Sequence, residues 1–170
     1  APKASSSSSS NAESALVLSS PNFVNGGKLS IDNTCEGKGI SPELTWTGGS
    51  SKIVSYVIIM DTIPGPLRPG EVDIGNHFYL TVYNIPATTK LLPAGAVNVG
   101  TLGHNFQGKK LGYTPPCSQG PGVKSYTVNL YALSENLSLK NTEATQKNLL
   151  VAMNGKVIAT SSLTAFYERS

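Results

Sequence analysis

A stretch near the middle of the chain, residues 56–86, limits the folds that this sequence can adopt. It begins with five apolar residues, Tyr56 to Met60, and ends with a second strand-like run, His77 to Pro86. The segment 63–70 between them contains three prolines. Proline fixes φ and has no backbone N–H, so this segment forms neither a helix nor a hydrogen-bonded strand of a β-sheet. The pattern predicts two strands joined by a rigid loop.

Polar side chains mark the two ends of this loop. Asp61 follows the first apolar run directly, and His77 opens the second. If the two strands share a sheet, both residues come out at the same edge. Long ordered loops between core strands often carry function. We therefore expect a site near this edge.

The remaining sequence predicts a mainly β fold. Residues 43–46, 125–133 and 157–167 are short runs with polar and apolar residues in alternation, separated by turn signals. One helix is expected over 143–154, with Asn141 or Thr142 as its cap, Leu149, Leu150 and Met153 as its apolar stripe, and Gly155 just after it. This is the pattern of an antiparallel β-sandwich with one late α-helix and short peripheral helices.

The chain of 170 residues suits a single domain. Residues 1–14 include six consecutive serines and too few apolar side chains to offset the entropy of ordering. We expect a flexible Ser-rich tail over 1–14 and one domain over 15–170.

Composition excludes several functions. The net charge of +3 and the absence of Lys/Arg runs argue against nucleic acid, and no apolar stretch is long enough for a transmembrane helix. No motif for zinc, nucleotides or a catalytic serine is present. We expect no cofactor, no metal and no enzymatic activity.

Two cysteines, Cys35 and Cys117, each lie in a Gly/Pro-rich loop. They are either free thiols or a disulfide that closes a loop of about 80 residues, which contributes on the order of 4 kcal/mol in the chain-entropy model. The possible disulfide and the absence of an initiator Met favour a secreted or periplasmic protein, with a cytoplasmic one as the alternative.

Each candidate site residue also has a structural interpretation. His77 is either a hydrogen-bond donor to an anion or a general acid/base, or it is a histidine hydrogen-bonded at a sheet edge. Asp61 needs a partner if buried, or it forms a turn before Pro64. Lys124 offers a cation to a phosphate or is only solvated, and Tyr126 lines a pocket or packs in the core.

These residues occur within segments that resemble the phosphatidylethanolamine-binding protein family, also called Raf kinase inhibitor-like proteins, in its bacterial branch. The resemblance runs from about Leu18 to Tyr167. Its marks, in family order, are residues 34–37, 40–46, 56–61, His77-Phe78, 83–86, 112–117 and 126–133.

The resemblance implies a β-sandwich with a small anion-binding cavity at one end, which takes phosphate or phosphorylethanolamine head groups. The positions that match the family's pocket are Asp61, Pro64, His77, Phe78, Tyr113, Pro115, Pro116 and Tyr126. Three departures are visible. Thr62-Ile63 replaces a second acidic residue, Phe78 stands where Trp is usual, and Lys124 replaces the family's second pocket histidine.

The leading hypothesis is a non-enzymatic binding module for a small anion or a phospholipid-type head group. The alternative is a regulator of a protein partner, as a kinase or protease inhibitor or an extracellular signal, acting through the loop 64–75. Hydrolysis by Asp61 and His77 as an acid/base pair ranks lowest, because no nucleophile is apparent.

Overall fold

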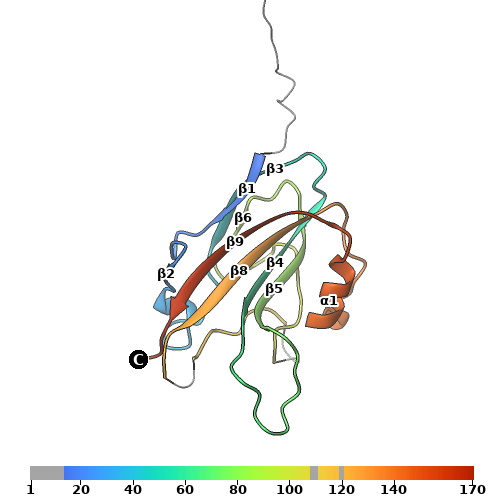
Figure 1. Cartoon of the computed structure of the whole chain (residues 1–170). Helices are drawn as coiled ribbons and strands as arrows, with labels where there is room; N and C mark the ends of the chain where they lie inside the picture. Colours follow the sequence, from blue (N-terminus) through green and yellow to red (C-terminus); the bar gives the residue numbers. More distant parts are fainter. Residues whose placement is uncertain (1–13, 108–110, 119–120) are drawn as a thin grey trace, which may run out of the picture.

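The computed structural model describes residues 14–107, 111–118 and 121–170, and these residues form two β-sheets and one α-helix (Figure 1). The predicted tail over 1–14 lies outside the described residues, apart from Ser14. The mainly β sandwich fold that the sequence predicts is confirmed.

The smaller sheet has three antiparallel strands in the order β1-β3-β6. The larger sheet has six strands in the order β2-β9-β8-β4-β5-β7 and is antiparallel except for the short pair β2–β9. The strands are β1 (Ser14–Ser19), β2 (Gly27–Lys28), β3 (Leu44–Gly49), β4 (Ser55–Thr62), β5 (His77–Pro86), β6 (Leu91–Leu92), β7 (Thr101–Leu102), β8 (Lys124–Leu133) and β9 (Val157–Tyr167).

The helix α1 (Gln146–Met153) is shorter than the sequence predicts. Thr145 adopts an extended conformation, and its hydroxyl accepts a hydrogen bond from the N–H of Asn148, so the helix begins after Thr145. The predicted caps instead begin a separate 3₁₀ turn, η3 (Asn141–Glu143), and a second such turn, η2 (Ile31–Asn33), lies earlier. Leu149 and Met153 are buried as expected, but Leu150 is exposed.

Strand β4 is buried on both faces. Tyr56, Ile58 and Met60 belong to the core between the sheets. Val57 and Ile59 belong to a second cluster on the outer face, which α1 covers through Leu149 and Met153. This double cover explains why the sequence shows an unbroken apolar run here rather than an alternating one.

A β-bulge sets the register between β4 and β5 at the end next to their connecting loop. Met60 lies opposite Leu80, but Asp61 lies opposite Phe78, so Tyr79 is the extra residue on β5. Because paired residues point to the same side of a sheet, the bulge decides which β5 side chains face inward beyond this point.

Asn84 holds the other end of β5 in place. It has a positive φ of 53°, and its side-chain amide bonds both the N–H and the C=O of Leu137, at 2.8 and 2.9 Å. Leu137 is buried, so its backbone groups depend on this amide. Asn tolerates the left-handed region better than most residues.

Replacing Asn84 should separate its two roles. Asn84→Gly keeps the backbone conformation and loses both hydrogen bonds, which should lower the free energy of unfolding by about 2–3 kcal/mol. Asn84→Ala also strains the positive φ and should cost about 1 kcal/mol more. Urea denaturation measures both, with exposed Asn136→Ala as the control. Wild-type stability of Asn84→Ala would contradict this account.

Candidate functional site

A cavity of about 740 Å³ opens at the end of the sandwich where β4 ends and β5 and β8 begin. One wall is the loop between β4 and β5, which extends beyond the end of the sheets (Figure 1). The sheet contributes the other wall, and two later segments contribute the rest. The lining residues are 62–68, 71, 72, 74, 77, 79, 106, 107, 114, 115, 117, 118, 124 and 126.

Aromatic rings form the inner wall of this end cavity. The His77 ring stacks on Phe106, with centroids 4.7 Å apart and planes within 4°. Tyr79 contacts Phe106 and Tyr126 at centroid distances of 5.0 and 5.2 Å. Successive ring contacts of this kind fix the orientation of each side chain. The wall is therefore a rigid platform with a polar atom on most of its rings.

The phenols of this wall are neutral hydrogen-bonding groups. Burial raises the pKa of Tyr79 well above its usual range, and Tyr126 raises it further. Burial also raises the pKa of Tyr126. A neutral phenol can donate its proton to an anionic ligand without adding negative charge to the cavity.

Charged side chains occupy the mouth of the cavity. Arg68 on the loop and Lys124 at the start of β8 are its cations, and Glu71 is its carboxylate among the lining residues. The Glu71 carboxylate already accepts a hydrogen bond from the backbone N–H of Arg68 at 2.7 Å. The charges of these three groups sum to +1, with His77 as a further potential donor.

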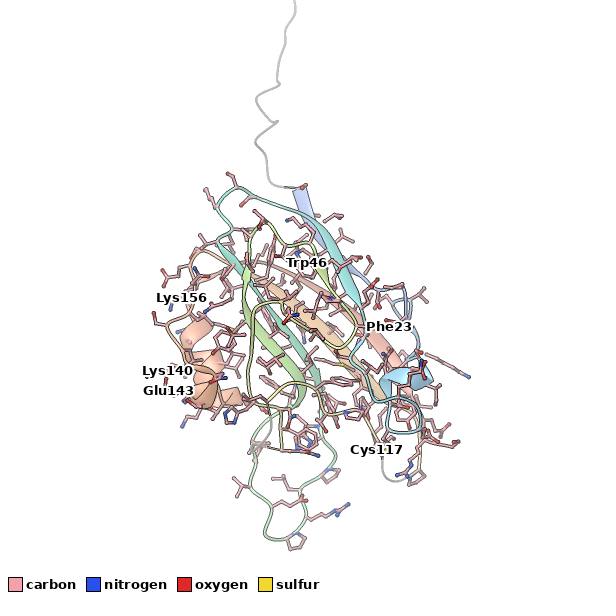
Figure 2. All side chains as sticks on the ribbon, turned by 180° about the vertical axis from the view of Figure 1, so that it is seen from behind. Phe23, Trp46, Cys117, Lys140, Glu143 and Lys156 are labelled. Carbon is pink, nitrogen blue, oxygen red and sulfur yellow. A yellow bond between two sulfur atoms is a disulfide. The ribbon has the colours of Figure 1, made fainter. Side chains whose placement is uncertain are left out.

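The Tyr-Thr-Pro-Pro-Cys segment, residues 113–117, is held in place by the loop around η2. The chain forms the Cys35–Cys117 disulfide, with Cα atoms 5.3 Å apart, so the two cysteines are not free thiols. Two further bonds, from the N–H of Cys35 to Pro116 and from the hydroxyl of Tyr113 to Asn33, tie it to the loop around η2. Figure 2 shows Cys117 near the same end of the molecule as the β4–β5 loop.

The structure brings five of the nine predicted ligand-binding residues together. Pro64, His77, Pro115, Lys124 and Tyr126 all line the end cavity, and their roles there remain predictions. Tyr113 and Pro116 lie just behind the cavity wall. The Tyr113 hydroxyl bonds the backbone of Asn33, and Pro116 is buried.

Asp61 and Phe78 lie on the opposite face of the sheet, which corrects the expectation that they share a cavity with His77. Neighbouring residues of a strand point to opposite faces, so His77 and Phe78 cannot both face inward. Phe78 packs in the cluster under α1. Asp61, opposite Phe78 in the register, lines a separate cavity. Asp61 and His77 therefore do not form an acid/base pair.

Sequence reasoning missed Thr62, Tyr79 and Phe106. Thr62 lies on the same face of β4 as Ile58 and Met60 and lines the end cavity. The alternation of side chains along a strand therefore predicts its position. The same alternation along β5 places Tyr79 on the same face as His77. Phe106 lies in a Gly-rich loop, and no local pattern indicates its contact with His77.

Among the described residues, no group of three or more His, Cys, Asp or Glu side chains is placed to hold a metal ion. The same part of the chain contains no helix that is long and apolar enough to cross a membrane.

Comparison with known proteins identifies the family. The family model described as phosphatidylethanolamine-binding protein matches residues 19–168. The chain belongs to the phosphatidylethanolamine-binding protein family. It is 35% identical to a UPF0098 protein of Pyrococcus horikoshii, over 86% of this chain and 74% of the relative. It is 33% identical to a UPF0098 protein of Aquifex aeolicus, over 91% and 89%.

Solved structures agree with this membership. The crystal structure of CT736 from Chlamydia trachomatis, described as a homolog of phosphatidylethanolamine-binding protein, is 32% identical with a TM-score of 0.81, over 92% of this chain and 99% of that one. YbcL of E. coli, described as a new member of the mammalian family, has a TM-score of 0.78 at 23% identity over 92% and 100%, which shows the fold alone. The family's fold supports a binding protein in general.

Removing the disulfide should loosen the cavity wall of this family member. The Cys35→Ala/Cys117→Ala double variant loses a cross-link spanning 82 residues, which should lower the free energy of unfolding by on the order of 4 kcal/mol. Hydrogen exchange should also quicken at the N–H of Thr114, which bonds Tyr79.

Urea denaturation and amide exchange measure the two effects. Reduced wild-type protein serves as the control and should behave like the double variant. Unchanged stability and unchanged exchange at Thr114 would contradict the role given to the disulfide.

Proposed function

We propose that the end cavity binds a small anion or the phosphate of a phospholipid-type head group, and that the chain acts as a non-enzymatic binding protein. One observation carries the proposal. Two cations, an imidazole and neutral phenols converge on one cavity in which a single carboxylate, Glu71, is already hydrogen-bonded.

The groups of the cavity suit a phosphate in complementary ways. Lys124 and Arg68 supply charge-assisted hydrogen bonds, which are about twice as strong as neutral ones. Tyr79 and Tyr126 hydrogen-bond each other, so this pair of phenols leaves one neutral O–H donor on a rigid wall, and little entropy is lost when the ligand binds. His77 adds an N–H donor whose ring is held by Phe106.

The size and rim of the cavity favour a ligand larger than phosphate alone. A volume of about 740 Å³ falls in the range of small-molecule sites. Ile63, Leu67 and Val72 line its mouth and are about half exposed or more. These aliphatic groups suit the glycerol or acyl part of a head-group ester.

Phosphate affinity tests the proposal. Titration of phosphate and phosphorylethanolamine, followed by NMR, should shift the signals of His77, Lys124 and Tyr126 in a saturable way. Lys124→Gln removes one charge-assisted bond and should weaken phosphate binding about tenfold or more. Glu71→Gln removes the opposing charge and should tighten it.

Exposed Lys147→Gln on α1 is the matched control and should bind phosphate like the wild type. Equal affinities of wild type, Lys124→Gln and Glu71→Gln would refute binding in this cavity, as would shifts that never saturate.

A second candidate function is regulation of a protein partner, and the loop favours it. Ile63 and Val72 are 80% and 77% exposed, and Leu67 and Ile74 are about half exposed. Four exposed aliphatic side chains on one projecting loop exceed the scattered single residues of an ordinary surface. Such a loop could enter the active site of a protease or cover a kinase.

The double variant Leu67→Ser/Val72→Ser tests this second function. If wild-type protein inhibits a member of a panel of purified proteases and kinases, the variant should lose most of that inhibition. Leu150→Ser/Val151→Ser on α1 changes equally exposed aliphatic groups and should retain it. Equal inhibition by all three proteins would remove the loop from the mechanism.

We also propose a secreted or periplasmic location. The disulfide supports it, because such bonds persist mainly in oxidising compartments.

A further inference from the structure

A second, smaller cavity of about 370 Å³ lies on the outer face of the larger sheet, behind the end cavity. Asp61 from β4, Asn76 from the loop, and Thr127, Asn129 and Tyr131 from β8 line it, with Thr62, Ile63 and Ser125. In β8, alternate residues point to opposite faces, so this row faces away from the core that holds Tyr126 and Val128.

The carboxylate of Asp61 has no cationic partner in this cavity. Its oxygens accept hydrogen bonds from the side-chain amides of Asn76 at 3.2 Å and Asn129 at 3.3 Å, both long for such bonds. None of the ion pairs found within 14–107, 111–118 and 121–170 includes Asp61. Asp61 is partly buried, and this burial raises the pKa of its carboxyl group, against the lowering effect of the bonds from Asn76 and Asn129.

The other polar groups of the cavity are neutral, and two of them are hydrogen-bonded to side chains of the neighbouring strand β9. The Thr127 hydroxyl pairs with that of Thr164 at 3.0 Å, and the Asn129 carbonyl oxygen accepts a bond from Ser162 at 3.0 Å. A carboxylate has about four lone-pair sites, and Asp61 uses two. The cavity therefore presents one negative charge with unused acceptor capacity.

Tyr131 contributes an aromatic ring to the lining of this cavity. Burial raises the pKa of Tyr131, and the negative charge of Asp61 raises it further, so its phenol stays neutral beside the carboxylate. A neutral aromatic ring next to a carboxylate attracts organic cations through its π face.

We propose that this second cavity binds the primary ammonium group of a small organic amine. An ammonium group brings the positive charge that Asp61 lacks and three N–H donors for its free lone pairs. A sugar would bring donors but no charge, so the carboxylate would remain uncompensated. A calcium ion needs six or more oxygen ligands, usually with several carboxylates, and this cavity offers one.

NMR titration with methylammonium and propylammonium chloride tests the proposal on the unmodified chain. We expect saturable shifts of the Asn76 and Asn129 side-chain amides and of the backbone at Asp61 and Tyr131. Sodium chloride at equal ionic strength is the salt control, and glucose tests the hydroxyl alternative. Neither should give saturable shifts at these residues.

Asp61→Asn keeps the shape of the side chain and removes its charge, so ammonium binding should weaken at least about tenfold. The control Asp73→Asn makes the same change three residues from Asn76, at a position that lines neither cavity, and should bind as the wild type does.

Three results would overturn the proposal: no saturable shift at these residues with either amine, equal affinity in Asp61→Asn, or saturation by glucose instead. The mapping on the unmodified chain decides the matter even if Asp61→Asn does not fold. Since phosphate is absent from these titrations, the result is independent of the function proposed for the end cavity.

Discussion

The burial of β4 on both faces is the constraint on which the rest of the structure depends. Its inward residues form the sandwich core with the smaller sheet, and its outward residues meet α1. The apolar packing on both faces of β4 ends near the same end of the strand, where the apolar run is followed by Asp61 and Thr62. Consecutive strand residues face opposite sides, so Asp61 lines only the outer cavity, whereas Thr62 lies at the strand end where the two cavities meet and lines both.

The two cavities differ in charge although they meet at the end of the larger sheet, where Thr62 and Ile63 line both of them. The end cavity gathers Arg68, Lys124 and neutral phenols, whereas the outer cavity contains an uncompensated Asp61. Asp61 is the one charged residue among the described residues that line the outer cavity, whereas Arg68, Lys124 and Glu71 line the end cavity. Groups of opposite charge can thus lie near one another in the chain without neutralising each other.

Much of the fold could be predicted from the sequence, because alternation in β3 and β8 and the unbroken run of β4 report burial directly. The site was harder to predict. The sequence places Asp61 and His77 at one edge, but the choice of face depends on the bulge at Tyr79, which no local residue pattern indicates. The contact between His77 and Phe106 depends on a loop about 30 residues away, which only the assembled chain positions.

The bulge at Tyr79 determines which side chains of β5 face the end cavity. Leu80 pairs with Met60, and without the bulge Tyr79 would pair with Asp61. Phe78 would then point inward, and His77 and Tyr79 would point outward. The inner wall of the end cavity would then be apolar, and both polar rings would lie on the outer face of the sheet with Asp61. A single irregularity in strand pairing, rather than any change of composition, is therefore sufficient to turn a polar recess into an apolar one.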